Sequence, residues 1–128
     1  MKNRQIFEAA LRLLAESSAP EETEDYEERA PYLLAAFCTE MCDLDKKFRL
    51  IAKDTADVVI DTVLLPLDGD FPLSPRFTVA ASLYLAAMLI LDSDEERSDA
   101  LYEQYTDTIS RIADSIPATL TSIVNKYF

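Results

Sequence analysis

The residues best suited to chemistry in this chain are its carboxylates, which number twenty-four among 128 residues. Paired carboxylates can hydrolyse glycosides or hold Mg²⁺, but they must converge in one pocket, and no spacing in the sequence predicts such a constellation. The segment "DGD" at residues 68–70 is too short for a calcium loop, whose ligands are spread over about twelve residues. We therefore predict no catalytic residue, no metal site and no cofactor.

Other residue types that are common in active sites are missing. The chain has no histidine, which excludes imidazole bases, Ser-His-Asp triads and histidine-containing zinc motifs. Its one glycine, Gly69, excludes the glycine-rich phosphate loops of the Rossmann and Walker types. A serine nucleophile would need lysine as its base, and we expect the five lysines to be solvated. These absences predict a protein that is not an enzyme.

The two cysteines are separated by one helical turn. Cys38 and Cys42 stand four residues apart, which places them on one face of a helix. This spacing favours a buried, reduced pair of thiols. Half of a metal site and a disulfide remain as alternatives.

Basic residues gather at one place only. Residues 46–53 hold one third of the twelve cations of the chain, namely Lys46, Lys47, Arg49 and Lys53. Cations at the end of a helix complement the partial negative charge of its last carbonyl groups, which accounts for Lys46 and Lys47 without a ligand. The alternative is a contact with an acidic partner, either another copy of this protein or nucleic-acid phosphate at one point.

The net charge and the longest apolar run limit the possible partners. A net charge of −12 argues against a broad nucleic-acid interface and against stable sequence-specific DNA binding. The uncharged run of thirteen residues from Val79 to Leu91 is too short to cross a bilayer as a helix, which needs about twenty residues. We expect this run to be a buried helix, covered by its own domain and in part by a neighbouring subunit. The N-terminus shows no secretion signal, and we predict no membrane contact.

Apolar residues recur at helical spacing in four stretches and predict an all-α fold. The expected helices cover residues 3–17, about 29–44, 75–91 and 93–116. A proline-rich connection is expected at about 62–75, residues 55–66 fit either strand or helix, and residues 115–128 fit a short helix or an extended arm. The whole predicts a single-domain bundle of four to five helices over residues 1–128, with its core at 25–114.

Several helix boundaries carry local signals. The six carboxylates of residues 21–28 suggest a solvated connection that turns helical at its end, and Pro31 is expected in the first turn of the second helix or at a kink. Ser74, followed by proline, is the expected side-chain cap of the third helix. Ser93 is the expected cap of the fourth, in a capping box with Glu96.

The order of these features resembles a known family. The segments "DYEERAPYLLAAFCTEM", "LDGDFPLSPRF", "AASLYLAAMLILDSDEE" and "ALYEQYTDTISRI" together are similar to the small all-helical head-tail connector proteins of tailed phages and prophages. The resemblance covers roughly residues 25–112, and the motifs are loose. In that family a long helix carries a tyrosine and an arginine, which correspond here to Tyr105 and Arg111, so the resemblance makes these two candidate interaction residues.

The resemblance implies a function without catalysis. It implies a homo-oligomeric, ring-like subunit between the portal and tail proteins, located in the bacterial cytoplasm or in the virion. Its channel would pass DNA without binding it, and carboxylates that face the channel would repel phosphate.

Two other functions fit the sequence. The first is a small acidic regulator or nucleic-acid-mimicking inhibitor that binds a basic protein, which the charge alone supports. The second is a helical adaptor of another pathway.

Overall fold

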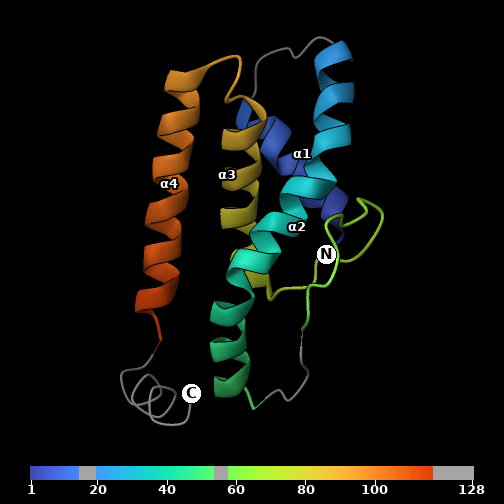
Figure 1. The fold of residues 1–128 in the computed structure, drawn as a ribbon. Helices are drawn as coiled ribbons and strands as arrows, with labels where there is room; N and C mark the ends of the chain where they lie inside the picture. Colours follow the sequence, from blue (N-terminus) through green and yellow to red (C-terminus); the bar gives the residue numbers. More distant parts are fainter. Residues whose placement is uncertain (15–19, 54–57, 117–128) are drawn as a thin grey trace.

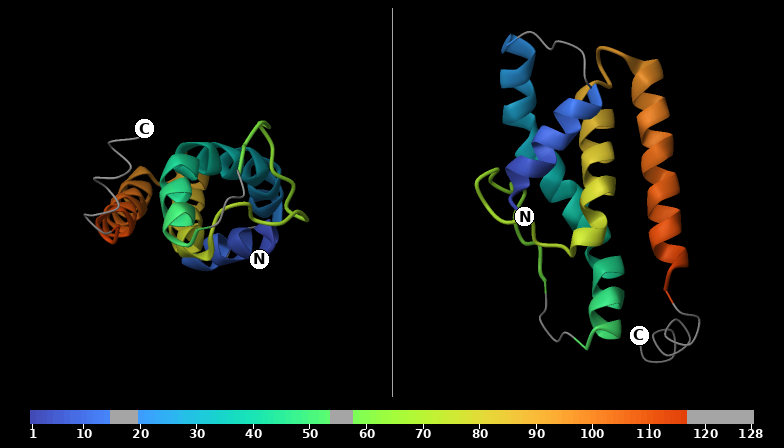
Figure 2. Two further views of the ribbon diagram at one scale, coloured as in Figure 1. Left: turned by 90° about the horizontal axis from the view of Figure 1, so that it is seen from below. Right: turned by 180° about the vertical axis from the view of Figure 1, so that it is seen from behind.

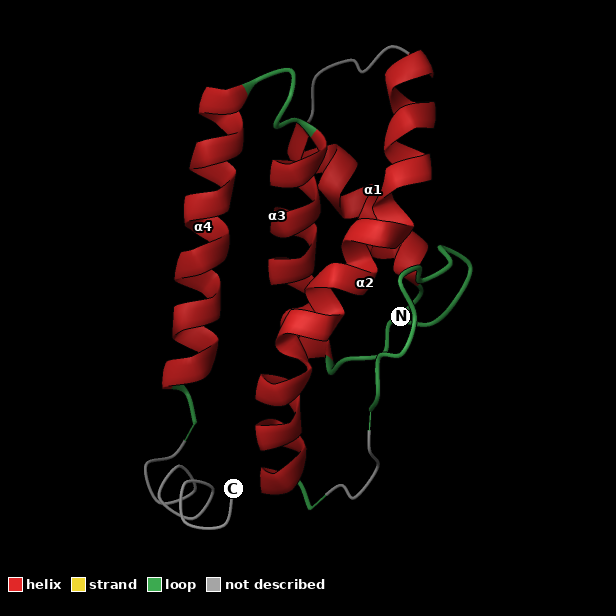
Figure 3. Ribbon diagram, viewed as in Figure 1, coloured by secondary structure: helices red, strands yellow, loops and turns green. Residues whose placement is uncertain are grey.

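The fold is all-α, as the sequence predicts. The computed structural model describes residues 1–14, 20–53 and 58–116, except for the side chains of residues 20–23. It contains α1 (Asn3–Leu14), α2 (Pro20–Ile51), the 3-10 turn η1 (Pro75–Phe77), α3 (Thr78–Leu89) and α4 (Glu95–Asp114) (Figure 1). In these ranges Figure 3 shows helices and loops but no strand. Three expected segments lie partly outside the described part, namely the first helix at 15–17, the segment 55–66 at 55–57, and the tail 115–128 at 117–128.

The third helix is the centre of the bundle. α3 contacts α1, α2 and α4, and η1 leads directly into it. A helix that is apolar on nearly every side must be surrounded, and eight of the twelve residues of α3 are buried. This confirms the prediction that the uncharged run is a buried helix. The two ends of the run are exceptions: Val79 is 63% exposed, and Leu91, beyond the end of α3, is 45% exposed.

The second helix is longer than predicted at both ends. The stretch at residues 21–28 is helical, and Pro31 is the twelfth residue of α2 instead of a first-turn residue. Proline has no N–H to donate to the carbonyl of Glu27, and α2 bends along its length (Figure 1). The Pro31 carbonyl accepts a hydrogen bond from Leu65 N at 3.1 Å, which ties the bend to the connection.

The proline-rich connection packs back on the domain and caps α1. Residues 58–74 form no helix or strand, and Leu67, Phe71 and Leu73 are buried in the core, as their apolar character predicts. The first amides of α1 find carbonyl partners there: Asn3 N donates to Gly69 O at 3.0 Å and Arg4 N donates to Leu67 O at 2.9 Å.

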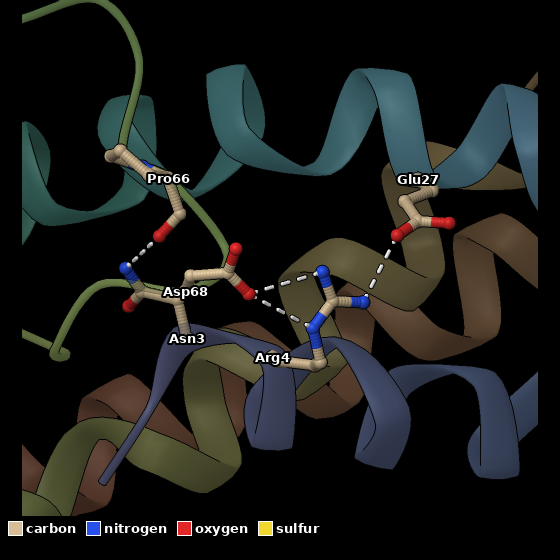
Figure 4. Close-up of polar contacts among 5 residues, drawn as sticks. All are labelled: Asn3, Arg4, Glu27, Pro66 and Asp68. Atoms are coloured by element: carbon tan, nitrogen blue, oxygen red, sulfur yellow. Dashed lines mark hydrogen bonds and ion pairs between the residues drawn. The ribbon is translucent and has the colours of Figure 1, made fainter.

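Side chains strengthen this cap, as Figure 4 shows. Asn3 Nδ2 donates to Pro66 O at 2.9 Å, and the Arg4 guanidinium binds both Asp68 and Glu27. Arg4 therefore joins α1, α2 and the connection. A Cβ at Gly69 would stand 3.2 Å from Pro66 O, so a side chain at this position would crowd the backbone.

Two predicted caps are wrong in detail. Ser74 precedes Pro75 at the start of η1, but its side chain makes no capping hydrogen bond. Its backbone N–H donates instead to the buried carboxylate of Asp45 at 2.9 Å. The cap of α4 is Asp94 in place of Ser93, and its carboxylate accepts from Arg97 N at 3.1 Å. Aspartate fills this position well because its charge also complements the positive end of the helix dipole.

Arginines from other helices close the C-terminal ends of α1 and α3. Arg29 of α2 donates to the carbonyls of Met88 and Leu89 at 3.1 and 3.2 Å. Arg97 of α4 donates to Leu13 O and Leu14 O at 3.1 and 2.7 Å. These contacts satisfy carbonyls that a C-terminal glycine motif would otherwise satisfy.

Candidate interaction surfaces

The predicted basic cluster lies around the C-terminal end of α2, which ends later than expected. Lys46 and Lys47 stand inside the helix, so the dipole argument applies to Arg49 in the last turn instead. Arg49 Nε donates to Asp45 Oδ2 at 2.6 Å and its Nη2 donates to Pro72 O at 3.1 Å, so this side chain holds the fold together. Lys53 follows the helix with a φ of 57°, the left-handed conformation that ends many helices.

Tyr105 is a core residue, which corrects its assignment as an interaction residue. It is 4% exposed, and its ring packs against Phe37 and Tyr84 at centroid distances of 6.1 and 5.3 Å. Burial raises the pKa of its hydroxyl. The resemblance singled out Tyr105, whereas its four-residue spacing from Leu101 places it on the buried face of α4.

The cysteines match the prediction in part. Both are free; Cys38 is fully buried and Cys42 is half-buried. Burial, followed by the charge of Asp45, raises the pKa of the Cys38 thiol to about 12, so it stays protonated near neutral pH.

Arg111 lines a hollow of about 590 Å³ where α1, α3 and α4 meet. We call this hollow the groove. Its apolar floor is formed by Ala9, Leu13, Val79 and Leu83. Leu13 and Val79 are 40% and 63% exposed, which leaves apolar surface open to solvent. Polar residues complete the lining, namely Arg12, Ser82, Gln104, Asp107, Thr108 and Arg111.

Three exposed arginines, Arg12, Arg76 and Arg111, form no ion pair within the described ranges, but Arg76 stacks on the Phe48 ring. Arg12 and Arg111 are exposed, and neither guanidinium makes a hydrogen bond or ion pair with another residue of the described ranges. Each stands in the last turn of its helix, where a cation complements the helix dipole. The dipole explains their position along α1 and α4, but it does not explain why both border the same apolar hollow.

A second surface runs along the outer side of α2. We call it the α2 stripe, and its five residues are all exposed and spaced four apart: Glu24, Glu28, Tyr32, Ala36 and Glu40. Each step of four residues advances about 6 Å along a helix, so the stripe is roughly 24 Å long. Tyr32, at its centre, is 56% exposed. The stripe thus presents an aromatic ring with carboxylates on both sides.

A shallower hollow of about 530 Å³ lies beside the stripe, where Tyr32 and Glu40 meet Val63 of the connection and Tyr84 of α3. Val63 is 79% exposed, which extends the apolar part of this surface. The pKa of Tyr84 is raised by burial first and then by the charge of Glu40.

Sequence reasoning missed Arg12, Val79 and the stripe. The four-residue spacing from Glu24 to Glu40 is visible in the sequence. These residues share one helix face because α2 continues through Pro31, which the sequence did not predict. No local signal predicts that Arg12 and Arg111, 99 positions apart, border one groove.

Within the described ranges no group of three or more Cys, Asp or Glu side chains is placed to hold a metal ion. No helix in that part of the chain is both long and apolar enough to cross a membrane. Comparisons with protein-family models, curated proteins and solved structures found no match to this chain.

Proposed function

We propose that the protein is a non-enzymatic structural subunit of a tailed phage or prophage, a head-tail connector that acts through ring-like self-association. The observation that carries the proposal is the groove: in a chain of net charge −12, two exposed arginines without an ion pair in the described ranges border one hollow, beside exposed apolar side chains. A surface of this kind is suited to an acidic protein partner, because charge-assisted contacts fix orientation while apolar contact supplies affinity. The partners would be other copies of the subunit and the portal and tail proteins, in the bacterial cytoplasm or in the virion.

The resemblance of the segments between residues 25 and 112 to connector proteins supplies the rest of the argument. The all-helical fold agrees with that resemblance, but it is shared by many unrelated proteins and carries little weight by itself. The strong negative charge suits a ring whose channel passes DNA without holding it.

Mass in solution tests the proposal. Light scattering over a wide range of protein concentration, with electron microscopy of the same samples, is expected to give closed rings for the protein alone or with its portal protein. Neighbouring terminase, portal and capsid genes would support the same conclusion. A monomer that forms no ring under either condition, from a locus without such genes, would refute it.

A small acidic regulator is the second candidate, and one observation favours it. α2 and α4 begin at the same end of the molecule, and both carry carboxylates in that region (Figure 1). Such an end could occupy a basic site on another protein. This function predicts a monomer or dimer that binds a basic protein and releases it as salt is raised.

A further inference from the structure

The groove and the α2 stripe carry opposite net charge, since Arg12 and Arg111 outnumber Asp107 in the groove and the stripe holds three glutamates. The groove offers an apolar floor between Arg12 and Arg111, and the stripe offers Tyr32 with Glu28 on one side and Glu40 on the other. We propose that the groove of one copy receives the α2 stripe of a second copy, with the Tyr32 ring on the floor and glutamates against the two arginines. This inference rests on the proposed self-association and names the surfaces that form it.

The groove and the stripe carry the residue types that are common at the centres of specific protein interfaces. Tyrosine and arginine are enriched at the centres of protein interfaces because a ring buries much area at little entropic cost and a guanidinium binds carboxylate with two donors. At about 590 Å³ the groove can accept a side chain of this size. Leu13 and Val79, exposed in the single chain, would be covered by the ring.

The net charge of the chain limits which surfaces can form a contact between two copies. Two chains of charge −12 repel each other, so an interface between them needs cations at its centre. Most other arginines already serve the fold: Arg4, Arg29 and Arg49 form ion pairs within the chain. Arg97 binds the last carbonyls of α1, and Arg76 stacks on the Phe48 ring. Arg12 and Arg111 make no such contact and can offset the acidity of a neighbouring copy.

The two surfaces cannot meet within one chain. Three stripe residues, Tyr32, Ala36 and Glu40, border a separate hollow with Val63 and Tyr84, and none of them lines the groove. The groove is formed by α1, α3 and α4, and Figure 2 shows α1 and α2 on different sides of the molecule. On α3 itself, Tyr84 borders the hollow beside the stripe, while Leu83 borders the groove.

A contact between two different surfaces is heterologous. Each copy that uses its groove leaves its stripe free for another copy, so the association continues until a ring closes. A two-fold symmetric dimer, in contrast, would bury the same surface on both copies.

Two variants separate the surfaces. The groove variant Arg12→Glu/Arg111→Glu keeps the stripe, and the stripe variant Tyr32→Glu keeps the groove. We expect the groove variant to weaken self-association by about a hundredfold, because two charge-assisted contacts are lost and each contributes roughly tenfold. We expect the stripe variant to weaken it by at least about tenfold, because a carboxylate replaces the ring on an apolar floor.

Mixing the two variants is the decisive measurement. The groove variant keeps an intact stripe, and the stripe variant keeps an intact groove. The mixture can therefore form one contact only, and light scattering should show a 1:1 pair that grows no further. Pairing also demonstrates that both variants are folded, and thermal unfolding monitored by circular dichroism checks this independently.

Matched controls place the same charges elsewhere. Lys47→Glu/Lys53→Glu changes the net charge as much as the groove variant does, but at the end of α2, and Tyr102→Glu changes an exposed tyrosine of α4. Both controls should associate like the unaltered protein.

The outcomes distinguish this inference from the proposed function. If the unaltered protein self-associates and the groove variant does so equally well, or if the mixture does not pair, the inference is wrong and self-association stands. If the unaltered protein stays monomeric alone and with a portal protein, both fail.

Discussion

Replacing Asp45 with alanine is expected to destabilise the fold strongly, because this carboxylate links the end of α2 to the start of α3. Its side chain is 1% exposed. One carboxylate oxygen accepts from Ser74 N at 2.9 Å, and the other accepts from Arg49 Nε at 2.6 Å. Arg49 in turn donates to Pro72 O at 3.1 Å, so the carboxylate orders the connection on both sides of Leu73.

The magnitude follows from what the substitution leaves behind. Alanine would leave the amide of Ser74 without its acceptor, which costs about 1 to 3 kcal/mol. It would also leave the Arg49 guanidinium without its carboxylate, and removing one partner of a buried pair costs about 3 to 5 kcal/mol. Because the Arg49 side chain is 20% exposed, water can replace part of the lost contact. We therefore expect the free energy of unfolding to fall by about 3 kcal/mol, near the lower end of that range.

Denaturant unfolding followed by circular dichroism measures this loss. The matched control is Asp43→Ala, which removes an exposed carboxylate two residues earlier on the same helix and should change the free energy by less than about 0.5 kcal/mol. The double variant Asp45→Ala/Arg49→Ala should cost less than the sum of the single variants, because both act on one interaction. Equal stability of the Asp45 and Asp43 variants would refute the assignment of Asp45 as the link.

Three further predictions follow from burial and capping. Leu85→Asp places a charge at a fully buried site of α3 and should unfold the domain, with a loss of about 4 kcal/mol or more in a melting experiment. Alkylation near pH 8 should modify Cys42 well before Cys38, because burial raises the pKa of Cys38 to about 12 and shields it; peptide mass spectrometry reads the order. Asp94→Ala should lower the free energy of unfolding by about 1 kcal/mol and Ser93→Ala by clearly less, since only Asp94 caps α4.

Each of these three has a control or a contradicting result. Val59→Asp, at a site that is 74% exposed, should leave the melting temperature nearly unchanged. Alkylation of Cys38 at the rate of Cys42 in the folded protein would contradict its burial. A larger loss for the Ser93 variant than for the Asp94 variant would restore the capping box that the sequence predicts.

Periodicity correctly predicted the helical class, and the uncharged run correctly predicted the buried helix, because both signals lie within a single element. From Val79 to Leu91 every side is apolar, so burial is required whatever the neighbours are. The proline-rich connection was also legible, since prolines and the one glycine forbid regular structure there. Its apolar residues suggested that the connection packs on the core, and Leu67, Phe71 and Leu73 are buried there.

Helix boundaries were less certain, for a physical reason. A proline and six carboxylates weaken a helix in isolation, so the sequence favoured a connection at residues 21–28. In the fold, Ala30 and Leu34 of the same helix are buried, and burial outweighs local preference and extends α2 back to Pro20.

The sequence by itself therefore determined the class of the fold, the burial of α3 and the absence of histidine chemistry, all of which depend on residue types and spacing within one segment. Only the tertiary structure decided which polar groups meet. Arg29 closes the end of α3 from 60 positions away, and Arg97 closes the end of α1 from 83 positions away. It likewise brings Arg12 and Arg111 to one groove and leaves the α2 stripe open. Such pairings depend on how whole helices pack against one another, and a local pattern does not contain that information.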